Sequence, residues 1–342
     1  MKKLILVFVA VMIAATSFAQ ENQPTAQDGA ATQTDESSQS AQSEQGAQHA
    51  YIPPKDKFTF MVTTIAAYNP NKDIFDWDYP YLFPLLGARY THLFTEPAAK
   101  QRVAFNANAS LSPIWLNGGA DVSWSPFSFF TLSLGATAGT SWNFSLGTLE
   151  VQSLAKYDSE NMEYDSITAF KHWGYEFFLQ GMFQYDFGAA LSGGKQHITF
   201  TGTGKVSYAG LTGAENGEMW KYMFMGEQVN GLKYDVSATL AYGLPFKFLR
   251  SASVTGRFTG YFSDSFFDEK YSNYDATFCD ISITPSLMAG IGRKDIFVLA
   301  VPFGTKRNYI GGDDDKDDEP LLKSDGRKWL WNGVMLTWTH IF

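Results

Sequence analysis

The chain has 342 residues, of which 16% are aromatic and 18% charged, and it carries a formal net charge of −9. This acidity argues against nucleic acid as a partner, because phosphate backbones bind basic surfaces. A single cysteine excludes an intrachain disulfide, so stability must come from burial and backbone pairing.

The N-terminal segment predicts export. Lys2 and Lys3 precede an apolar stretch that is too short for a spanning helix, and a small-x-small sequence ends at Ala19. We expect residues 1–19 to be a signal peptide that is cleaved after Ala19. Cleavage removes two lysines and no acids, which lowers the net charge from −9 to −11.

A polar segment follows the predicted signal peptide. Residues 20–54 are mostly Gln, Ser, Ala, Thr, Glu and Asp, with no aromatic residue before Tyr51. Such a composition cannot bury enough apolar surface to offset the entropy of ordering. We expect a disordered tether here, which lies in the periplasm, contacts peptidoglycan or threads the interior of the domain that follows.

Residues 55–342 alternate between apolar and small polar side chains, which predicts strands with two different faces. In Arg102–Leu111, for example, apolar residues alternate with Asn106, Asn108 and Ser110. We predict about twelve such strands, near Phe58–Tyr68, Leu82–Phe94, Arg102–Leu111, Gly118–Ser125, Phe129–Gly139, Trp173–Phe187, His197–Tyr208, Leu232–Leu244, Ser251–Phe262, Thr277–Ile291, Asp295–Thr305 and Lys328–Phe342.

The fold class that this pattern favours is all-β, an antiparallel transmembrane up-and-down β-barrel. Short and long connections alternate along the chain, with Ser112–Asn117 as an exception, and an even strand number places both termini on the periplasmic side. A soluble sandwich or lipocalin-like barrel also alternates, but its polar faces carry charge. Here those faces are mostly uncharged, and the charges gather in the long connections.

The last strand has alternate apolar residues at Val334, Leu336, Trp338 and Phe342. It resembles the terminal signal of Gram-negative outer-membrane β-barrel proteins, although His340 departs from the aromatic or aliphatic residue usual at its position. The resemblance implies outer-membrane localisation and recognition of these four residues by the barrel-assembly machinery.

Aromatic residues are expected at the two membrane boundaries, where the lipid partners include lipopolysaccharide-like lipids. The outer girdle is predicted at Tyr309, Trp329 and Trp331, and the inner girdle at Tyr185, Trp338 and Phe342.

Charged residues on the polar faces are the candidates for function, because lumen charges tune selectivity in wide barrels. They are Arg89, Lys205, Arg257, Glu176, Asp186, Asp235 and Asp121. Lys205 lies about level with Asp235, so we expect a pair across the sheet. These charges either form a selectivity filter or stabilise a filled interior, and the sequence does not choose between the two.

Few residues of the sequence suggest catalysis or metal binding. No His has a Ser two residues away on the same strand face, His197 and Thr199 adjoin a turn, and only His172 lies near acidic loop residues. Asp313, Asp315 and Asp317 have the spacing of a calcium loop, but Asp318 stands where that loop needs glycine. We therefore expect a solvated acidic loop, no metal site, no cofactor and no enzyme activity.

The leading hypothesis is a passive channel for small hydrophilic solutes. The alternatives are a non-conducting barrel for adhesion or envelope structure and, less favoured, an outer-membrane hydrolase.

Overall fold

The computed structural model describes residues 54–68, 81–96, 99–146, 149–187, 197–223, 225–310 and 319–342. The predicted signal peptide and nearly all of the predicted tether lie outside the described residues. Of the helices within the described ranges, none is long and apolar enough to cross a bilayer.

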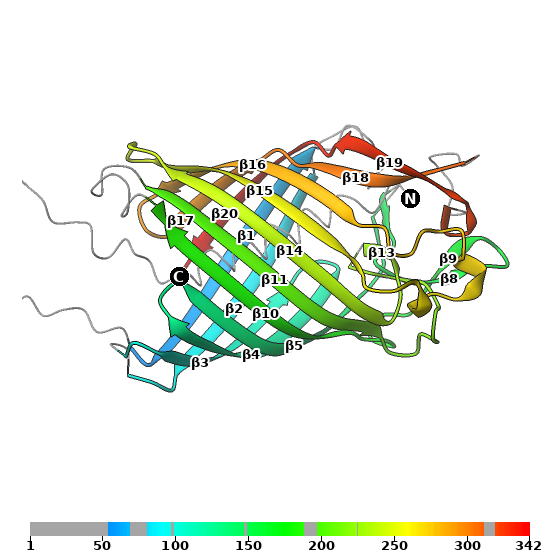
Figure 1. The fold of residues 1–342 in the computed structure, drawn as a ribbon, viewed down its shortest axis with the longest axis horizontal. Helices are drawn as coiled ribbons and strands as arrows, with labels where there is room; N and C mark the ends of the chain where they lie inside the picture. The colour runs from blue at the N-terminus through cyan, green and yellow to red at the C-terminus, as the bar shows by residue number, and fades with distance from the viewer. Residues whose placement is uncertain are drawn as a thin grey trace, which may run out of the picture.

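Twelve antiparallel strands form a closed barrel (Figure 1). Ten are continuous and two are interrupted, and the period-2 pattern predicted all twelve. In chain order they are β1 (Asp56–Tyr68), β2 (Tyr81–Leu93), β3 (Arg102–Leu111), β4 (Trp115–Phe127), β5 (Phe130–Ser141), β10 (Gly174–Asp186), β11 (Ile198–Leu211), β14 (Gly231–Gly243), β15 (Leu249–Tyr261), β16 (Asp280–Ile291), β17 (Asp295–Ala300) continued by β18 (Phe303–Tyr309), and β19 (Ser324–Trp331) continued by β20 (Val334–Ile341).

The barrel closes where the first and last strands meet. β1 pairs antiparallel with β20, with Met61 opposite Ile341 and Tyr68 opposite Val334, and the backbone N–H of Phe342 donates to the carbonyl of Phe60 at 3.0 Å. Closure removes unpaired strand edges, which cannot be left exposed to hydrocarbon.

Both interrupted strands break at the same level. Pro302, which has no backbone N–H, separates β17 from β18, and Gly333 (φ 90°) separates β20 from β19. The N–H of Asn332 donates to the carbonyl of Pro302 at 2.9 Å, which ties the two breaks together. Beyond them β18 and β19 continue as a hairpin toward the long loops.

The outer surface of the barrel is an apolar band. Large hydrophobic side chains are exposed at alternate strand positions all around it, such as Leu134 (66% exposed), Phe177 (59%) and Leu240 (54%). The opposite face of the same strands carries small polar residues and a few charges. This arrangement inverts that of a soluble barrel and matches burial in lipid.

The terminal strand alternates as predicted. Leu336 and Phe342 are exposed on the outer surface, whereas Met335, Thr337 and Thr339 are buried on the inner one. His340 lies on the outer face, and its Nδ1 is 2.9 Å from Asp295 Oδ1 on the neighbouring β17. His340, which stands where an aromatic or aliphatic residue is usual, thus has a charged partner on the adjacent strand.

The girdle prediction needs one correction. Trp329 and Trp331 are exposed, as expected, but Tyr309 packs against a buried cluster formed by the loops. Its position at the end of the β18–β19 hairpin places the ring among loop residues instead of at the lipid surface.

Short turns lie at one end of the barrel, here called the turn end, together with Asp56 and Phe342; the long connections lie at the other, the loop end (Figure 1). The long connections contain further strands: β6 (Phe144–Leu146), β7 (Leu149–Val151), β8 (Leu154–Asp158), β9 (Glu163–Ser166), β12 (Trp220–Tyr222) and β13 (Met225–Gln228). Short 3-10 helices η2 (Asp264–Phe266), η3 (Glu269–Tyr271) and η4 (Glu319–Leu321) complete the elements. Cys279, half-buried, lies directly before β16.

Candidate functional site

Three long loops fold together at the loop end. Residues 142–173 supply β8 and β9, residues 212–230 supply β12 and β13, and the four strands form one sheet in the order β13-β12-β8-β9. The loop between β15 and β16, residues 262–279, packs beside this sheet. We call these three segments the cap.

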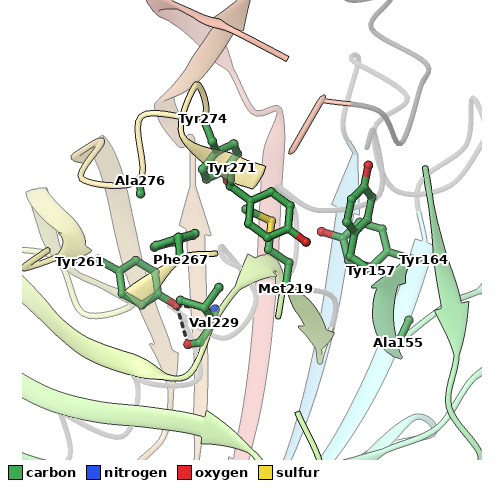
Figure 2. Packing of buried hydrophobic residues seen from close by; sticks show 10 residues of the cluster. All are labelled: Ala155, Tyr157, Tyr164, Met219, Val229, Tyr261, Phe267, Tyr271, Tyr274 and Ala276. Atoms are coloured by element: carbon green, nitrogen blue, oxygen red, sulfur yellow. Dashed lines mark hydrogen bonds between the residues drawn. The ribbon is translucent and has the colours of Figure 1, made fainter. Parts of the chain in front are cut away.

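The cap has a buried core that is rich in tyrosine (Figure 2). This tyrosine cluster joins all three cap loops to the end of β15, and its members are at most 9% exposed. They are Ala155, Tyr157, Tyr164, Met219, Val229, Tyr261, Phe267, Tyr271, Tyr274 and Ala276. The hydroxyl of Tyr261 accepts from the N–H of Val229 at 2.9 Å and so anchors the 212–230 loop to β15.

A second buried cluster attaches the cap to the opposite wall. Leu85 of β2 and Trp115 of β4 pack with cap residues that include Leu154 and Trp220. Since the tyrosine cluster holds β15 and this cluster holds β2 and β4, the cap is anchored on both sides of the barrel mouth. It therefore crosses the mouth.

Tyr222 of β12 shows how closely the cap fits the wall. Its hydroxyl lies against Gly139 of β5, and its ring lies against Gly174 of β10, the residue paired with Gly139. A Cβ at Gly174 would be 3.0 Å from Tyr222 Cε1, so both glycines are needed for this approach. Burial raises the pKa of Tyr222 well above that of a free phenol.

Arg307 of β18 connects the cap to the barrel. Its Nη1 donates to the hydroxyl of Tyr274 at 2.7 Å and lies 3.4 Å from Glu227 Oε2, and its Nη2 donates to the carbonyl of Asp275 at 3.3 Å. Glu227 (φ 57°) and Asp275 (φ 55°) both have left-handed backbones, which are costly for residues other than glycine. We call these four residues the Arg307 latch.

Two groups of charges line the interior below the cap, on opposite sides of the strand ring. The first spans β2, β3 and β4. Arg89 donates to Asn106 Oδ1 at 3.3 Å, and Asn106 Nδ2 donates to Asp121 Oδ2 at 2.9 Å, so the amide bridges the two predicted lumen charges.

The second group spans β10 to β15. Lys205 forms an ion pair with Glu176 at 2.8 Å, and Arg257 binds Asp235 through two nitrogens. Lys205 is opposite Asp235 in the register, as expected, but the predicted ion pair between them is not formed. Instead, Lys205 pairs diagonally with Glu176 on β10, and Asp235 pairs diagonally with Arg257 on β15.

Asp186 differs from the other predicted lumen charges. It lies at the last position of β10, at the turn end, 3.5 Å from Nδ1 of His197. It is therefore far along the strand from Glu176, and the structure does not bring it together with the two charged groups beneath the cap.

Sequence reasoning missed four charged residues: Lys233, Asp280, Glu227 and Arg307. Lys233 and Asp280 are inward-facing strand residues on the same faces as Asp235 and Ser282, so strict period-2 counting could have found them. Glu227 and Arg307 meet from segments 80 residues apart, and no local pattern signals that contact.

The structure describes His172, the catalytic candidate, but not the acidic loop considered for metal binding. The imidazole of His172 packs against Gly213, and the backbone carbonyl of His172 accepts from Thr140 Oγ1 at 3.0 Å. Asp313, Asp315 and Asp317 lie outside the described residues, and within those residues no group of three or more potential metal ligands comes together.

Comparison with family models gives no match, and neither does comparison with curated protein sequences. Solved structures with a similar course of the chain include the β domain of the Bordetella autotransporter BrkA, with 8% identity and a TM-score of 0.38 over 84% of this chain and 99% of that one. LpxR from Salmonella typhimurium has 11% identity and a TM-score of 0.36 over 83% and 100%. An outer-membrane channel from Pseudomonas putida F1 has 12% identity and a TM-score of 0.37 over 88% and 100%.

Identities and TM-scores this low carry no argument about function. The strand register itself establishes the architecture. Twelve antiparallel strands close on themselves, the outer surface is apolar, and the polar faces turn inward. The chain is therefore a transmembrane antiparallel β-barrel.

Proposed function

We propose that the protein is a passive channel for small hydrophilic solutes whose outer mouth is narrowed by the cap. The observation that carries this proposal is the inward face: hydroxyl and amide side chains line it, and two charged groups face each other across it. Charges on opposite walls of the lumen are what tunes the selectivity of a pore.

In the proposed mechanism, solutes cross the barrel by diffusion, through an electric field that is directed across the lumen. Arg89 and Asp121 lie on one wall, and Lys205, Asp235 and Arg257 lie on the other. A polar solute replaces part of its hydration shell with hydroxyl and amide contacts while its dipole aligns between these walls. The cap limits the size of solutes that reach this level.

The proposed orientation follows from the same geometry. β1 begins and β20 ends at the turn end, so both termini belong in the periplasm and the cap faces outward, as is usual for short turns and long loops. Lipids of the outer membrane would contact the apolar band, and the assembly machinery would engage β20.

Planar-bilayer recording tests the channel. We expect small, steady conductance steps, and we expect Lys205→Gln combined with Arg257→Gln to shift the reversal potential toward cations, because two lumen cations are removed. Lys171→Gln, at an exposed cap position, is the matched control and should leave the reversal potential unchanged. The absence of steps at any voltage, with folded protein in the bilayer, would contradict the proposal.

One observation favours a second function, a non-conducting surface barrel: the cap crosses the mouth and is anchored on both sides. For that function the cap is a binding surface instead of a constriction. Shortening the 142–173 loop separates the two functions, since a channel should then conduct more and a surface barrel should still not conduct.

A further inference from the structure

Several charged residues of the wall from β10 to β18 form ion pairs, two of them within that wall and one with the cap. Lys205 pairs with Glu176, Arg257 with Asp235, and Arg307 with Glu227. Such pairs contribute to the electric field in the lumen, but each charged group already has a partner and is less available to bind a solute directly. Lys233 of β14 and Asp280 of β16 are a further cation and a further acid on the inner face of this wall.

Lys233 is the second residue after the start of β14 and lies directly below the cap, opposite Tyr261 of β15. Its ammonium group donates to the amide oxygen of Gln228 and lies 5.1 Å from the ring centroid of Tyr261. Within the described part of the chain, no carboxylate lies at ion-pair distance from it. Its positive charge is half-buried, and the contacts that the described residues give it are one amide and one aromatic ring.

Asp280 begins β16, opposite Thr259 of β15 and on the inner face. Its carboxylate accepts no hydrogen bond and forms no ion pair with the residues that the structure describes. The charged groups that face it are Arg307, Glu227, Lys233 and Arg327. Those facing Lys233 are Glu176, Lys205, Asp235 and Asp280.

The two residues are neighbours across one intervening strand. β14 and β16 both pair with β15, so their axes are about 10 Å apart. Asp280 is offset along the wall by two residues, because it pairs with Thr259 where Lys233 pairs with Tyr261. Among the described residues the two groups form no direct ion pair, and a backbone separation of this kind leaves room for a small molecule that bridges both groups.

We propose that Lys233 and Asp280 form a binding site for small zwitterions that carry both a carboxylate and an ammonium group, such as free amino acids or short peptides. The ligand carboxylate accepts from the ammonium of Lys233, and the ligand ammonium donates to the carboxylate of Asp280. Both half-buried charges then gain charge-assisted partners that the folded chain does not supply. The inference deepens the proposed channel by naming its solute class and rests on that proposal for its physiological meaning.

Calorimetric titration of the purified full-length mature protein in detergent tests the site without requiring conduction. The probes are the dipeptide alanyl-alanine, its N-acetyl form, which has no ammonium, and its amide, which has no carboxylate. We expect the dipeptide to bind at least tenfold more tightly than either blocked form. Free alanine, tested in parallel, distinguishes an amino acid site from a peptide site.

Variants assign the binding to the two residues. Lys233→Gln and Asp280→Asn should each weaken dipeptide binding at least tenfold, while Lys171→Gln should not change it. Heat-modifiable electrophoretic mobility shows that each variant is a folded barrel. The exchanged pair Lys233→Asp with Asp280→Lys should bind better than either single charge reversal, because a zwitterion can turn around.

Three results would overturn the inference: no binding of any probe, equal binding of the N-acetyl form and the free dipeptide, or dipeptide binding that both variants leave intact. The results distinguish failure of the zwitterion site from failure of the proposed channel function. A protein that conducts but binds no zwitterion contradicts this site alone, whereas one that binds the dipeptide but never conducts contradicts the channel alone.

Discussion

At the scale of single residues, the Arg307 latch gathers several interactions on one side chain. Its guanidinium reaches a carboxylate, a phenol and a backbone carbonyl, and its Cζ lies 4.0 Å from the ring centroid of Tyr274. Two residues that it contacts have left-handed backbones, a local cost that the latch must offset. The latch therefore determines whether two cap loops stay on the barrel.

Arg307→Met should loosen the cap. The substitution leaves the carboxylate of Glu227, whose side chain is 15% exposed, without its cation, and breaking a buried pair in this way costs about 3–5 kcal/mol. Hydrogen exchange should show faster exchange of amides 219–230 and 262–279, with the spanning strands unchanged.

A double-mutant cycle checks the cause. Adding Glu227→Gln to Arg307→Met removes the orphaned charge while keeping the side-chain size, and it should restore part of the protection of these amides. If the two substitutions instead add up without coupling, the latch is not the source of the cap's stability.

At the scale of elements, the cap and the wall fit through glycine. Gly139 and Gly174 leave room for Tyr222, whereas Gly204 on β11 has nothing within 4 Å of where a Cβ would lie. All three residues are glycines in strands, yet only Gly139 and Gly174 are required for packing. This difference gives a matched pair of substitutions.

Gly174→Ala should displace Tyr222, whose ring atoms are the nearest neighbours of a Cβ at that position, and destabilise the cap by about 1–3 kcal/mol, the usual cost of overpacking. Gly204→Ala should leave the cap unaffected. Limited proteolysis of the 212–230 loop in folded protein is the measurement, and equal cleavage rates for both variants would rule out the proposed fit.

Alkaline pH should open the cap before it unfolds the barrel. Burial raises the pKa of Tyr271 to about 12 and that of Tyr274 well above 10, whereas an unfolded cap would ionise these phenols near 10. The raised values stabilise the cap fully below pH 10, and that contribution is lost as the pH rises toward 12.

Tyrosinate absorbance against pH, recorded together with cap proteolysis, is the measurement. We expect late ionisation of the buried phenols that coincides with cleavage of the cap. Complete ionisation near pH 10 with the cap still protected would show that these rings are not buried in solution.

The sequence predicted the strands well and the cap not at all. Alternation is local, so the range of β3 was predicted to the residue, and β10 and β14 to within one residue. The cap depends on contacts such as Tyr222 with Gly139 and Arg307 with Glu227, between segments far apart in the chain. The predicted ion pair between Lys205 and Asp235 was wrong because it rested on the register alone. In the tilted strands of the barrel, each residue pairs with a diagonal neighbour instead of the residue opposite it.

At the scale of the whole molecule, the barrel depends on one seam. β1 and β20 join the chain ends, and inward-facing Thr63 and Thr339 bring their hydroxyls within 3.0 Å across that seam. On the outside, the ring of Phe342 lies 5.5 Å from that of Phe60. The last residue thus contributes both a backbone bond and an aromatic contact to closure.

Phe342→Ala should reduce the amount of folded barrel in the outer membrane several-fold, because closure and the proposed recognition by the assembly machinery both use this residue. Heat-modifiable mobility of membrane fractions measures it, and Ile310→Ala, at an exposed position outside the seam, is the control. Unchanged levels of folded Phe342→Ala protein would remove Phe342 from the assembly signal.

The position of Cys279 has a practical consequence for all of these experiments. It is the single thiol of the chain, and it lies where the 262–279 loop ends and β16 begins. A spin label or fluorophore attached there needs no cysteine-free background and sits at the boundary between the part expected to move and the part expected to stay rigid. The native chain thus already carries an attachment point from which motion of the cap can be followed in real time.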